Sequence, residues 1–457
     1  MVGVSASDDK YPYRFIPEIL SAFVEDNGMM VEITLARPVA KAAVALATLG
    51  ICAVAVFGII SGFIVNVLAD ERIEVSRETL AVASRYFPTS PRLHARAAQA
   101  FYQRPDLKSQ ESHAISAVNL SPYNYRFRLL LASIEESEGE SSAAEQSLRE
   151  GLALAPNKAE THWQLANFLL RHGKLDPCIV EFRAACMINK ALLPITFNLI
   201  WRASGEDLNA IKAIAGDKSG SRLALAHFLF KQSRVDEAAN VFNQIERDDR
   251  LSSPDGLAFL NALISSGHLV LGRSTWIQTI GEGSQDNPLI WNGGFESDIV
   301  KGLAQFDWVI GHSNYAKFKF ATGEAHTGSR SLRIDFAGRD TTRLDGEIKQ
   351  MIVVHAGARY RLNCYAKAAR LITQDGPRVM IKTFAPLEWE AASAPVAVGQ
   401  DGWQYLSIEF TAPGLLVGEA RALYVTINRK PRFSYDEPTR GTVWFDDFTL
   451  TEVKETR

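Results

Sequence analysis

Cysteine is scarce in this chain, and the cysteines that occur are badly placed for cross-links. The 457 residues include four cysteines, which are too few for a disulfide framework. Cys178 and Cys186 are expected on one helix, about 12 Å apart along its axis, and a disulfide cannot span that distance. No CxxC pair or Cys/His spacing indicates zinc. We expect all four cysteines to be small, buried apolar residues.

The chain also lacks an excess of either charge. It has 49 basic and 52 acidic residues, and its net charge is −3. The basic residues are scattered, so no stripe of them could follow a phosphate backbone. We therefore expect an ordinary mixed-charge surface and no nucleic-acid partner.

Motifs of common catalytic sites are missing as well. The sequence contains no HExxH, GxSxG or GxxxxGK[ST], and its nine histidines are dispersed. Glu388 and Glu390 flank Trp389 and would lie about 7 Å apart on one face of a strand, not far from the spacing of a hydrolase pair. Almost any strand offers such a pair, so we expect no enzyme. A cryptic glycan hydrolase or lyase is the less favoured alternative.

One long apolar run stands out against this background. No charged residue occurs between Lys41 and Asp70, a span of 28 residues. A helix needs roughly 20 apolar residues to cross a bilayer, so we predict a transmembrane helix over residues 41–69. A cleaved signal peptide is the alternative, but its apolar region would be roughly 15 residues long and closer to the N-terminus.

The orientation of this predicted helix depends on its flanks. Lys41 precedes the apolar run, whereas Asp70 and Glu71 follow it. This contrast favours a cytoplasmic N-terminus. We therefore predict a single-pass protein of the inner (cytoplasmic) membrane. Residues 1–40 would be a cytoplasmic tail, and the bulk of the chain would be periplasmic or extracellular.

The segment from residue 71 to 280 is rich in alanine, leucine and charge, with helical periodicity. Several of its prolines and glycines recur every 34 residues: Pro88, Pro122 and Pro156, and likewise Gly139 and Gly173. A period of 34 is typical of tetratricopeptide repeats, in which each repeat is a pair of antiparallel helices. We predict an all-α solenoid of five or six such repeats, because stacking buries the apolar stripe of each one.

In each repeat, the expected turn residue serves as the reference from which the other structural positions are counted. The turn residues are Pro105, Gly139, Gly173, Gly205, Ser233 and Gly267. Seven residues earlier, where helices must approach closely, stand Ala98, Ala132, Ala166, Asn198, Ala226 and Leu260. Nine residues later, as core-filling side chains, stand Ala114, Leu148, Phe182, Ile214, Phe242 and Trp276. The resemblance to tetratricopeptide repeats implies a partner-binding groove, to which it assigns Gln99, Asn167, Arg171, His227, Lys231 and Asn261.

After a turn-rich linker at residues 281–288, the pattern changes to short alternating runs punctuated by Gly, Pro and Asp. Such runs predict an all-β sandwich or jelly roll over residues 289–453. The order of NGGFE, FDWVI, GEAHTGSRSLRIDF, GWQYLSIEFTAP and GTVWFDDFTL resembles the jelly-roll carbohydrate-binding modules, of galactose-binding-like type, that accompany xylanases. The resemblance implies that NGGFE and VWFDDF are the first and last strands and lie close together.

The same resemblance implies a structural calcium ion where those two strands meet. Its ligands would be acidic side chains from the first and last strands and carbonyl oxygens from the HTGSRSL turn. The matching positions are Glu296, Gly328 to Arg330, and Asp446. Calcium prefers hard oxygen ligands of these kinds. Asp447 could replace Asp446, and hydrogen bonding without a metal is the open alternative.

Sugar recognition would need aromatic rings that pack on pyranose C–H groups, and planar polar side chains for hydroxyls. The candidates are Trp389, Tyr315, Gln350 and Lys382. Trp389 lies between two glutamates, an unusual place for a buried ring.

Together these features predict a membrane-anchored bacterial envelope scaffold, accessory to polysaccharide synthesis or export. The helical repeats would hold an envelope or secretion protein, and the C-terminal domain would hold a polysaccharide, so that each binding event raises the effective concentration for the other. The alternative is a structural assembly factor whose jelly roll binds no sugar.

Overall fold

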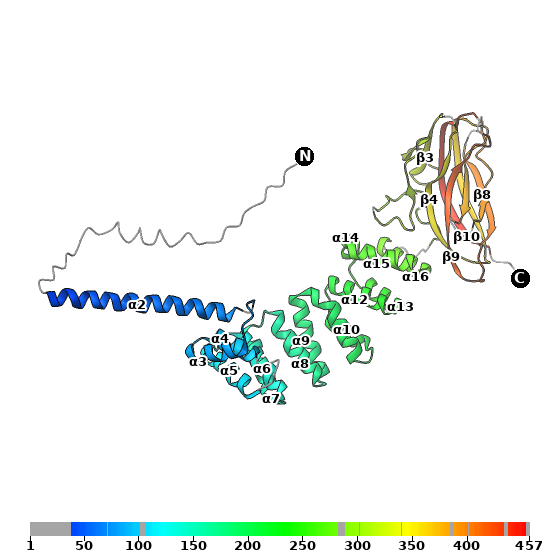
Figure 1. Cartoon of the computed structure of the whole chain (residues 1–457). Coiled ribbons are helices and arrows are strands. Elements are labelled where there is room, and N and C mark those ends of the chain that lie inside the picture. Colours follow the sequence, from blue (N-terminus) through cyan, green and yellow to red (C-terminus); the bar gives the residue numbers. More distant parts are fainter. Residues whose placement is uncertain are drawn as a thin grey trace. The chain divides into compact units, whose positions relative to one another are not determined.

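A computed structural model describes residues 38–70, 72–100, 107–281, 288–300, 302–339, 341–383, 388–400, 402–433 and 437–453. Most of the predicted N-terminal tail, most of the predicted linker and the predicted turn residue Pro105 lie outside these residues. The chain divides into two compact units, residues 1–154 (unit 1) and 155–457 (unit 2). Along the chain, an apolar helix, helical repeats and a β-sandwich follow one another (Figure 1), so the predicted fold class is confirmed.

Helix α2 (Pro38–Ala69) contains the predicted apolar run. Proline suits its first turn, where a backbone N–H would have no helical partner. An 18-residue window within Ala42–Ala69 has a mean hydropathy of 2.6, and none of that window is buried against protein. Among the described residues it is the one helix long and apolar enough to cross a membrane.

The rest of unit 1 consists of paired helices. They are α3 (Arg77–Tyr86), α4 (Pro91–Ala100), α5 (Leu107–Leu120), α6 (Tyr125–Ser137) and α7 (Ser141–Leu154). Ser76 and Asn124 cap α3 and α6, because their side-chain oxygens accept backbone N–H groups of the first turn. A core of small and branched residues that includes Ala98, Ala114 and Leu131 lies between the helices.

Unit 2 continues the helical pairs. They are α8 (Ala159–Arg171), α9 (Leu175–Ile188), the 3-10 turn η2 (Lys190–Leu192), α10 (Leu193–Ala203), α11 (Leu208–Ala215), α12 (Ser219–Lys231), α13 (Val235–Asn243), α14 (Arg247–Ser252), α15 (Pro254–Ser265) and α16 (Leu269–Ile280).

The turns between paired helices confirm the predicted repeat register. Gly139, Gly173, Gly205, Ser233 and Gly267 all have positive φ, between 60° and 88°. Glycine adopts this conformation without steric cost, which is why the period is visible in the sequence. All six residues predicted to fill the core, from Ala114 to Trp276, are buried.

Asn198 is the exception among the close-approach positions. It is exposed, and its amide donates to the carbonyl of Pro194 at 2.8 Å. Its neighbours Phe197 and Ile200 are buried in its place. Asn198 has the same offset from its turn as the buried Ala166, but α10 does not bury this side, so the prediction for Asn198 was wrong.

The β-domain is a sandwich of two antiparallel five-stranded sheets. The strands are β1 (Val309–Ile310), β2 (Ala316–Thr322), β3 (Arg330–Ala337), β4 (Leu344–His355), β5 (Arg359–Ile372), β6 (Arg378–Lys382), β7 (Glu390–Ala392), β8 (Gln404–Thr411), β9 (Ala420–Arg429) and β10 (Arg440–Glu452). Sheet A has the order β1-β4-β9-β6-β7, and sheet B has the order β2-β3-β10-β5-β8. Alternate residues of both sheets, such as Ile352, Val425 and Phe445, fill the core between them.

The NGGFE segment is a loop rather than the predicted first strand. Asn292 and Phe295 have positive φ, and the Asn292 side chain closes the loop through two hydrogen bonds with the backbone of Ser297. The expected meeting of the two ends is nevertheless found, since Phe448 N donates to Gly293 O at 3.0 Å. A Cβ on Gly293 would overlap the carbonyl of Phe448, so this approach requires glycine.

The last repeat packs directly on the start of the β-domain. Trp276 of α16 is fully buried, and its ring meets those of Trp291 and Phe306 edge to face. Its indole N–H donates to the carbonyl of Leu303 at 2.8 Å. Trp291, Leu303 and Phe306 therefore cover the apolar end that the final repeat would otherwise expose.

Trp276→Ala should cost about 3–5 kcal/mol, because it removes a fully buried indole and leaves a cavity. Trp276→Phe should cost less, since it keeps a ring and loses the bond to Leu303. Urea unfolding of the purified chain in detergent, followed by circular dichroism, measures both. Gln305→Ala is the control. If Trp276→Ala lowers the free energy of unfolding no more than the control does, the packing around Trp276 contributes no stability and the prediction is wrong.

Candidate functional site

The outward face of sheet A gathers polar and aromatic side chains, and we call it the sheet A face. In β9, Leu423, Val425 and Ile427 point into the core. The residues between them therefore point outward, which places Tyr424 and Asn428 on the opposite side. The same alternation in β4 and β6 brings neighbouring residues to this side. The sheet A face is defined here by Asp345, Lys349, Lys382, Tyr424, Thr426 and Asn428.

Asp345 is the centre of the polar contacts on this face. Its carboxylate accepts hydrogen bonds from Lys382 at 2.6 Å, Asn428 at 2.9 Å and Arg343 at 3.1 Å. Lys430 lies 3.4 Å away. Burial alone would raise the pKa of Asp345, but the bonds from Lys382 and Arg343 outweigh it and lower the pKa to about 2. The carboxylate is therefore ionised and shared among several cations.

The sheet A face also holds polar atoms without a protein partner. Thr426 Oγ1 and Asn428 Oδ1 are buried, and neither makes a hydrogen bond within the described residues. Beside them, Lys349 Nζ lies 5.9 Å from the centre of the Tyr424 ring. A half-buried ring and a shared carboxylate are groups with which proteins bind hydroxylated rings. Thr426 and Asn428 are fully buried, so they are not available to a ligand at the surface.

The four predicted sugar-binding residues do not come together. Lys382 lies on the sheet A face, in the ion pair with Asp345. Gln350 is fully buried and fastens the backbone of Trp291 through two hydrogen bonds, so it is not available to a ligand at the surface. It lies between Ile348 and Ile352, and the alternation of β4 turns all three inward.

Trp389 and Tyr315 lie elsewhere. Trp389 is half-buried and packs against the core, with its ring centre 5.7 Å from that of Phe410, rather than forming an exposed platform. Tyr315 precedes β2 of sheet B. The sequence prediction missed Tyr424, although the alternation of ARALYVTINR at residues 420–429 carried the signal.

The residues predicted to hold calcium do meet in space. Glu296 accepts hydrogen bonds from Ser329 N at 2.7 Å, Ser329 Oγ at 2.7 Å and Arg330 N at 2.9 Å. These bonds lower the pKa of Glu296. A Cβ on Gly328 would overlap the Glu296 carboxylate. The turn thus offers N–H and O–H groups to Glu296, which matches the alternative of closure without a metal.

Asp446 and Asp447 lie beside this turn and share one neighbour. Asp446 is fully buried and accepts from His326 N at 2.7 Å, while Asp447 Oδ2 lies 2.6 Å from His326 Nδ1. Burial, together with the Asp447 charge, raises the pKa of Asp446 to about 6. The register shift between Asp446 and Thr449 brings both aspartates to one side, against the expected alternation.

The donor set is therefore only partly suited to calcium. The carboxylates of Asp446 and Asp447 could ligate a cation, whereas the N–H groups around Glu296 could not. No group of three acidic, His or Cys side chains in the described part of the chain could hold a metal ion. Calcium stays a prediction.

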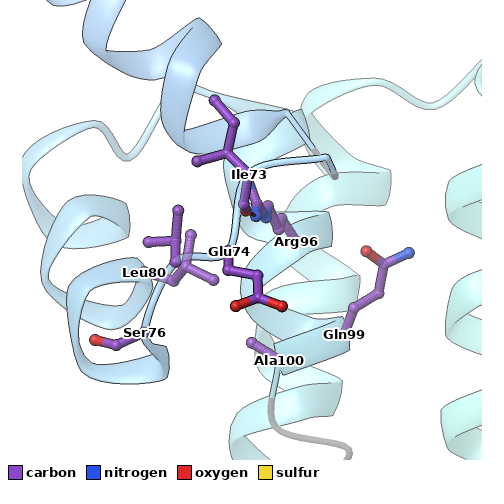
Figure 2. A pocket seen from close by; sticks show the side chains of 8 residues that line it. Ile73, Glu74, Ser76, Leu80, Arg96, Gln99 and Ala100 are labelled. Carbon is purple, nitrogen blue, oxygen red and sulfur yellow. Dashed lines mark hydrogen bonds between the residues drawn. The ribbon is translucent and has the colours of Figure 1, made fainter.

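The predicted groove residues fall in both units. In unit 1, Gln99 lines a cavity of about 760 Å³ with Glu74, Leu80 and Arg96, and Figure 2 shows these side chains around it. The Arg96 guanidinium donates to the carbonyls of Leu68, Asp70 and Ile73, so it fastens the segment after α2 to α4. This side chain is committed to the backbone, and Gln99 remains exposed.

In unit 2, the groove residues differ in how accessible they are. Arg171 and Lys231 are exposed at the ends of their helices. Asn167 donates to Trp163 O at 2.8 Å, and a ring nitrogen of His227 lies 3.0 Å from Asp255 O. Asn261 accepts from Gln305 Nε2 at 2.8 Å. The chain's own β-domain segment thus contacts the last repeat at one of the predicted groove positions.

Comparisons with known proteins give only distant likenesses. No family model and no curated protein matches the chain. The solved structure of MamA is 15% identical, covering 30% of this chain and 76% of MamA with a TM-score of 0.27. The first TPR of Spaghetti (RPAP3), bound to an HSP90 peptide, is 12% identical, covering 29% and 97% with a TM-score of 0.23. The CBM22-2 xylan-binding domain of Paenibacillus barcinonensis Xyn10C is 14% identical, covering 32% and 92% with a TM-score of 0.24.

Chelation tests the predicted calcium ion. An ion that holds Glu296 and Asp446 together stabilises the folded state by about 2.7 kcal/mol at a hundredfold excess over its Kd. Adding EDTA to the purified chain should then lower the melting midpoint of the β-domain, and calcium should restore it where magnesium does not. If EDTA leaves the melting midpoint unchanged, the calcium prediction is wrong and hydrogen bonds alone hold Glu296 to the turn.

Acid titration tests the Asp345 cluster. Because the folded pKa of Asp345 is depressed to about 2, its contribution to stability is present above its ordinary pKa and is lost as pH falls from about 4 towards 2. Asp345→Asn should therefore lose about 2 kcal/mol at pH 7 and show a flatter fall in stability below pH 4. If stability falls equally steeply with decreasing pH in Asp345→Asn and in the unmodified chain, the ion pairs of Asp345 do not stabilise the fold.

Proposed function

We propose that this protein is a membrane-anchored scaffold of the bacterial cell envelope. It holds a glycan on its β-sandwich and a protein partner on its helical repeats, as an accessory to polysaccharide synthesis or export. Helix α2 is the anchor in the cytoplasmic membrane, with the N-terminus inside and the repeats and β-domain outside.

The sheet A face is the observation that carries the glycan assignment. A glycan presents hydroxyl groups and flat C–H surfaces, so it needs both polar contacts and a ring. Tyr424 supplies the half-buried ring, and Lys349 beside it and the carboxylate of Asp345 supply polar contacts on the same face.

The protein partner is supported by the repeats. In unit 2, Arg171 of α8 and Lys231 of α12 end the first helices of two repeats, and both side chains are exposed. Repeat arrays present extended surfaces of this kind to partners. Because Gln305 already contacts Asn261, the partner engages repeats before the last one.

The two binding functions act together through tethering. A glycan held on the β-domain stays close to a protein held on the repeats, because one chain carries both. No chemical step is required of the scaffold. Glu388 and Glu390 accordingly take no catalytic part, and release of reducing sugar from a polysaccharide by the purified chain would contradict this.

Glycan-array binding of the purified chain in detergent tests the proposal. Tyr424→Ala should reduce binding about tenfold or more, because it removes the ring against which the sugar packs. The matched control is Tyr405→Ala, since Tyr405 is an exposed ring on the opposite sheet. If Tyr424→Ala and Tyr405→Ala bind the glycan equally well, the glycan site does not include Tyr424. If the unmodified chain binds no glycan, a structural assembly factor is favoured.

A further inference from the structure

A cavity lies among the helical repeats of unit 2. It has a volume of about 310 Å³ and is formed by the C-terminal parts of α9 and α11 and the first turn of α12. Its apolar wall includes Met187, Ile214 and Ala215, and none of the predicted groove residues lines it. This volume is at the lower end of the range for pockets that hold small molecules.

Two exposed cations line the cavity, Arg183 of α9 and Lys218, which precedes α12. Neither side chain makes a hydrogen bond or an ion pair with another described residue. The Arg183 guanidinium lies over Gly216, since a Cβ there would come within 3.0 Å of Arg183 Nη2. Gly216 ends α11 with a φ of 60°, so glycine allows both this turn and the close approach of the guanidinium.

The acidic side chains near this turn have partners of their own. Asp217 also lines the cavity, but its carboxylate accepts a hydrogen bond from the Arg222 guanidinium at 2.6 Å. Asp249 accepts a hydrogen bond from the Ser219 hydroxyl. Within the part of the chain that the structure describes, no carboxylate contacts either cation of the cavity.

The first turn of α12 favours an anion as well. Its N-cap residue, Lys218, provides no side-chain cap, and the Lys190 ammonium lies beside the turn, 3.8 Å from where a Cβ of Gly220 would stand. The start of a helix attracts anions and repels cations, because its first backbone N–H groups have no helical partner. The cations gathered at this helix start therefore lack the negative charge that would suit them.

Ser221 is the independent sign of a ligand in this cavity. It lines the cavity, and the residue is only 8% exposed. Its hydroxyl makes no hydrogen bond with any described residue. A buried hydroxyl without a partner is costly, so the cavity suits a group that accepts a hydrogen bond from Ser221.

Cys186 belongs to the wall of the cavity and adds no charge to it. Its sulfur lies 3.3 Å from Thr196 Oγ1. Burial raises the pKa of the Cys186 thiol above its ordinary value, so the thiol stays protonated at neutral pH and does not repel an anion.

We propose that this cavity binds a small phosphorylated molecule, whose phosphate group pairs with Arg183 and Lys218 and accepts a hydrogen bond from Ser221. A phosphate offers three strong acceptor oxygens and nearly two negative charges, which suits a guanidinium, an ammonium and a hydroxyl. The rest of the molecule packs on the wall formed by Met187 and Ile214. This site goes beyond the proposed function, because it involves neither the sheet A face nor the predicted groove.

Calorimetric titration of the full chain in detergent tests the site with four probes. They are inorganic phosphate, glucose 6-phosphate, glucuronate and glucose, of which the last three share a ring and differ in the group at C6. We expect glucose 6-phosphate to bind about tenfold more tightly than glucuronate, because a phosphate carries more charge and more acceptor oxygens than a carboxylate. Glucose should not bind measurably.

Methyl NMR of the 13C-methionine-labelled chain locates the bound probe. Glucose 6-phosphate should shift the signal of Met187, which lines the cavity, and leave that of Met351 in the β-domain unchanged. A shift of Met351 without a shift of Met187 would place the probe outside the cavity and overturn the inference.

Two single variants test the assigned contacts. Arg183→Gln and Ser221→Ala should each weaken the binding of glucose 6-phosphate about tenfold, because each removes a hydrogen bond to a charged group. The matched control is Arg202→Gln, which makes the same change at an exposed arginine of α10 that does not line the cavity. Melting midpoints equal to that of the unmodified chain confirm that the variants are folded.

Four further outcomes overturn the inference. If neither inorganic phosphate nor glucose 6-phosphate binds, the cavity is not a phosphate site. If glucuronate binds as tightly as glucose 6-phosphate, the assignment to phosphate is wrong. If Arg183→Gln and Arg202→Gln weaken binding equally, the attraction is a property of the whole surface.

The fourth outcome concerns the source of the phosphate. If a phosphoserine peptide binds more tightly than glucose 6-phosphate, and its unphosphorylated form does not bind, the ligand is a phosphorylated protein rather than a small molecule. None of these results bears on the proposed glycan binding, which the Tyr424→Ala variant tests separately.

Discussion

The alternation of side chains in β9 is the constraint on which the glycan account depends. Leu423, Val425 and Ile427 close the core, and that fixes Tyr424, Thr426 and Asn428 on the opposite face. A shift of one residue would exchange the two sets, so burial of the core and the outward placement of Tyr424 cannot be separated. The same strand sets the register that places Asp345 and Arg378 on either side of Asn428.

Two close contacts then decide how this face is held. Gly293 meets the backbone of Phe448, which ties the entry of the β-domain to its last strand. Trp276 of the final repeat packs against Trp291 and Phe306, so the β-domain covers the end of the repeats and needs no separate capping helix. The glycan face and the repeats of unit 2 are thereby joined through a packed interface as well as through the chain.

Much of this architecture could be predicted, because its signals are local. The positive φ at Gly173 and Gly267 requires a residue type that the sequence shows directly. The site was harder, since it depends on register across strands: the irregularity between Asp345 and Lys349 changes which residues of β4 face outward. Gln350 could have been excluded as a sugar-binding residue from the sequence, because it alternates with two core isoleucines. The burial of Trp389 against Phe410, in contrast, depends on packing between residues far apart in the sequence.

The most direct test of the sheet A face uses methionines that the chain already has. Met351 and Met380 alternate with core residues of β4 and β6 and so belong to the outward side, where they are buried at 9% and 6% exposure, whereas Met187 lies in α9 of the repeats. In methyl NMR spectra of the 13C-methionine-labelled chain, a bound polysaccharide should shift the signals of Met351 and Met380 and leave Met187 unchanged. Saturating polysaccharide that moves neither Met351 nor Met380 would contradict the account.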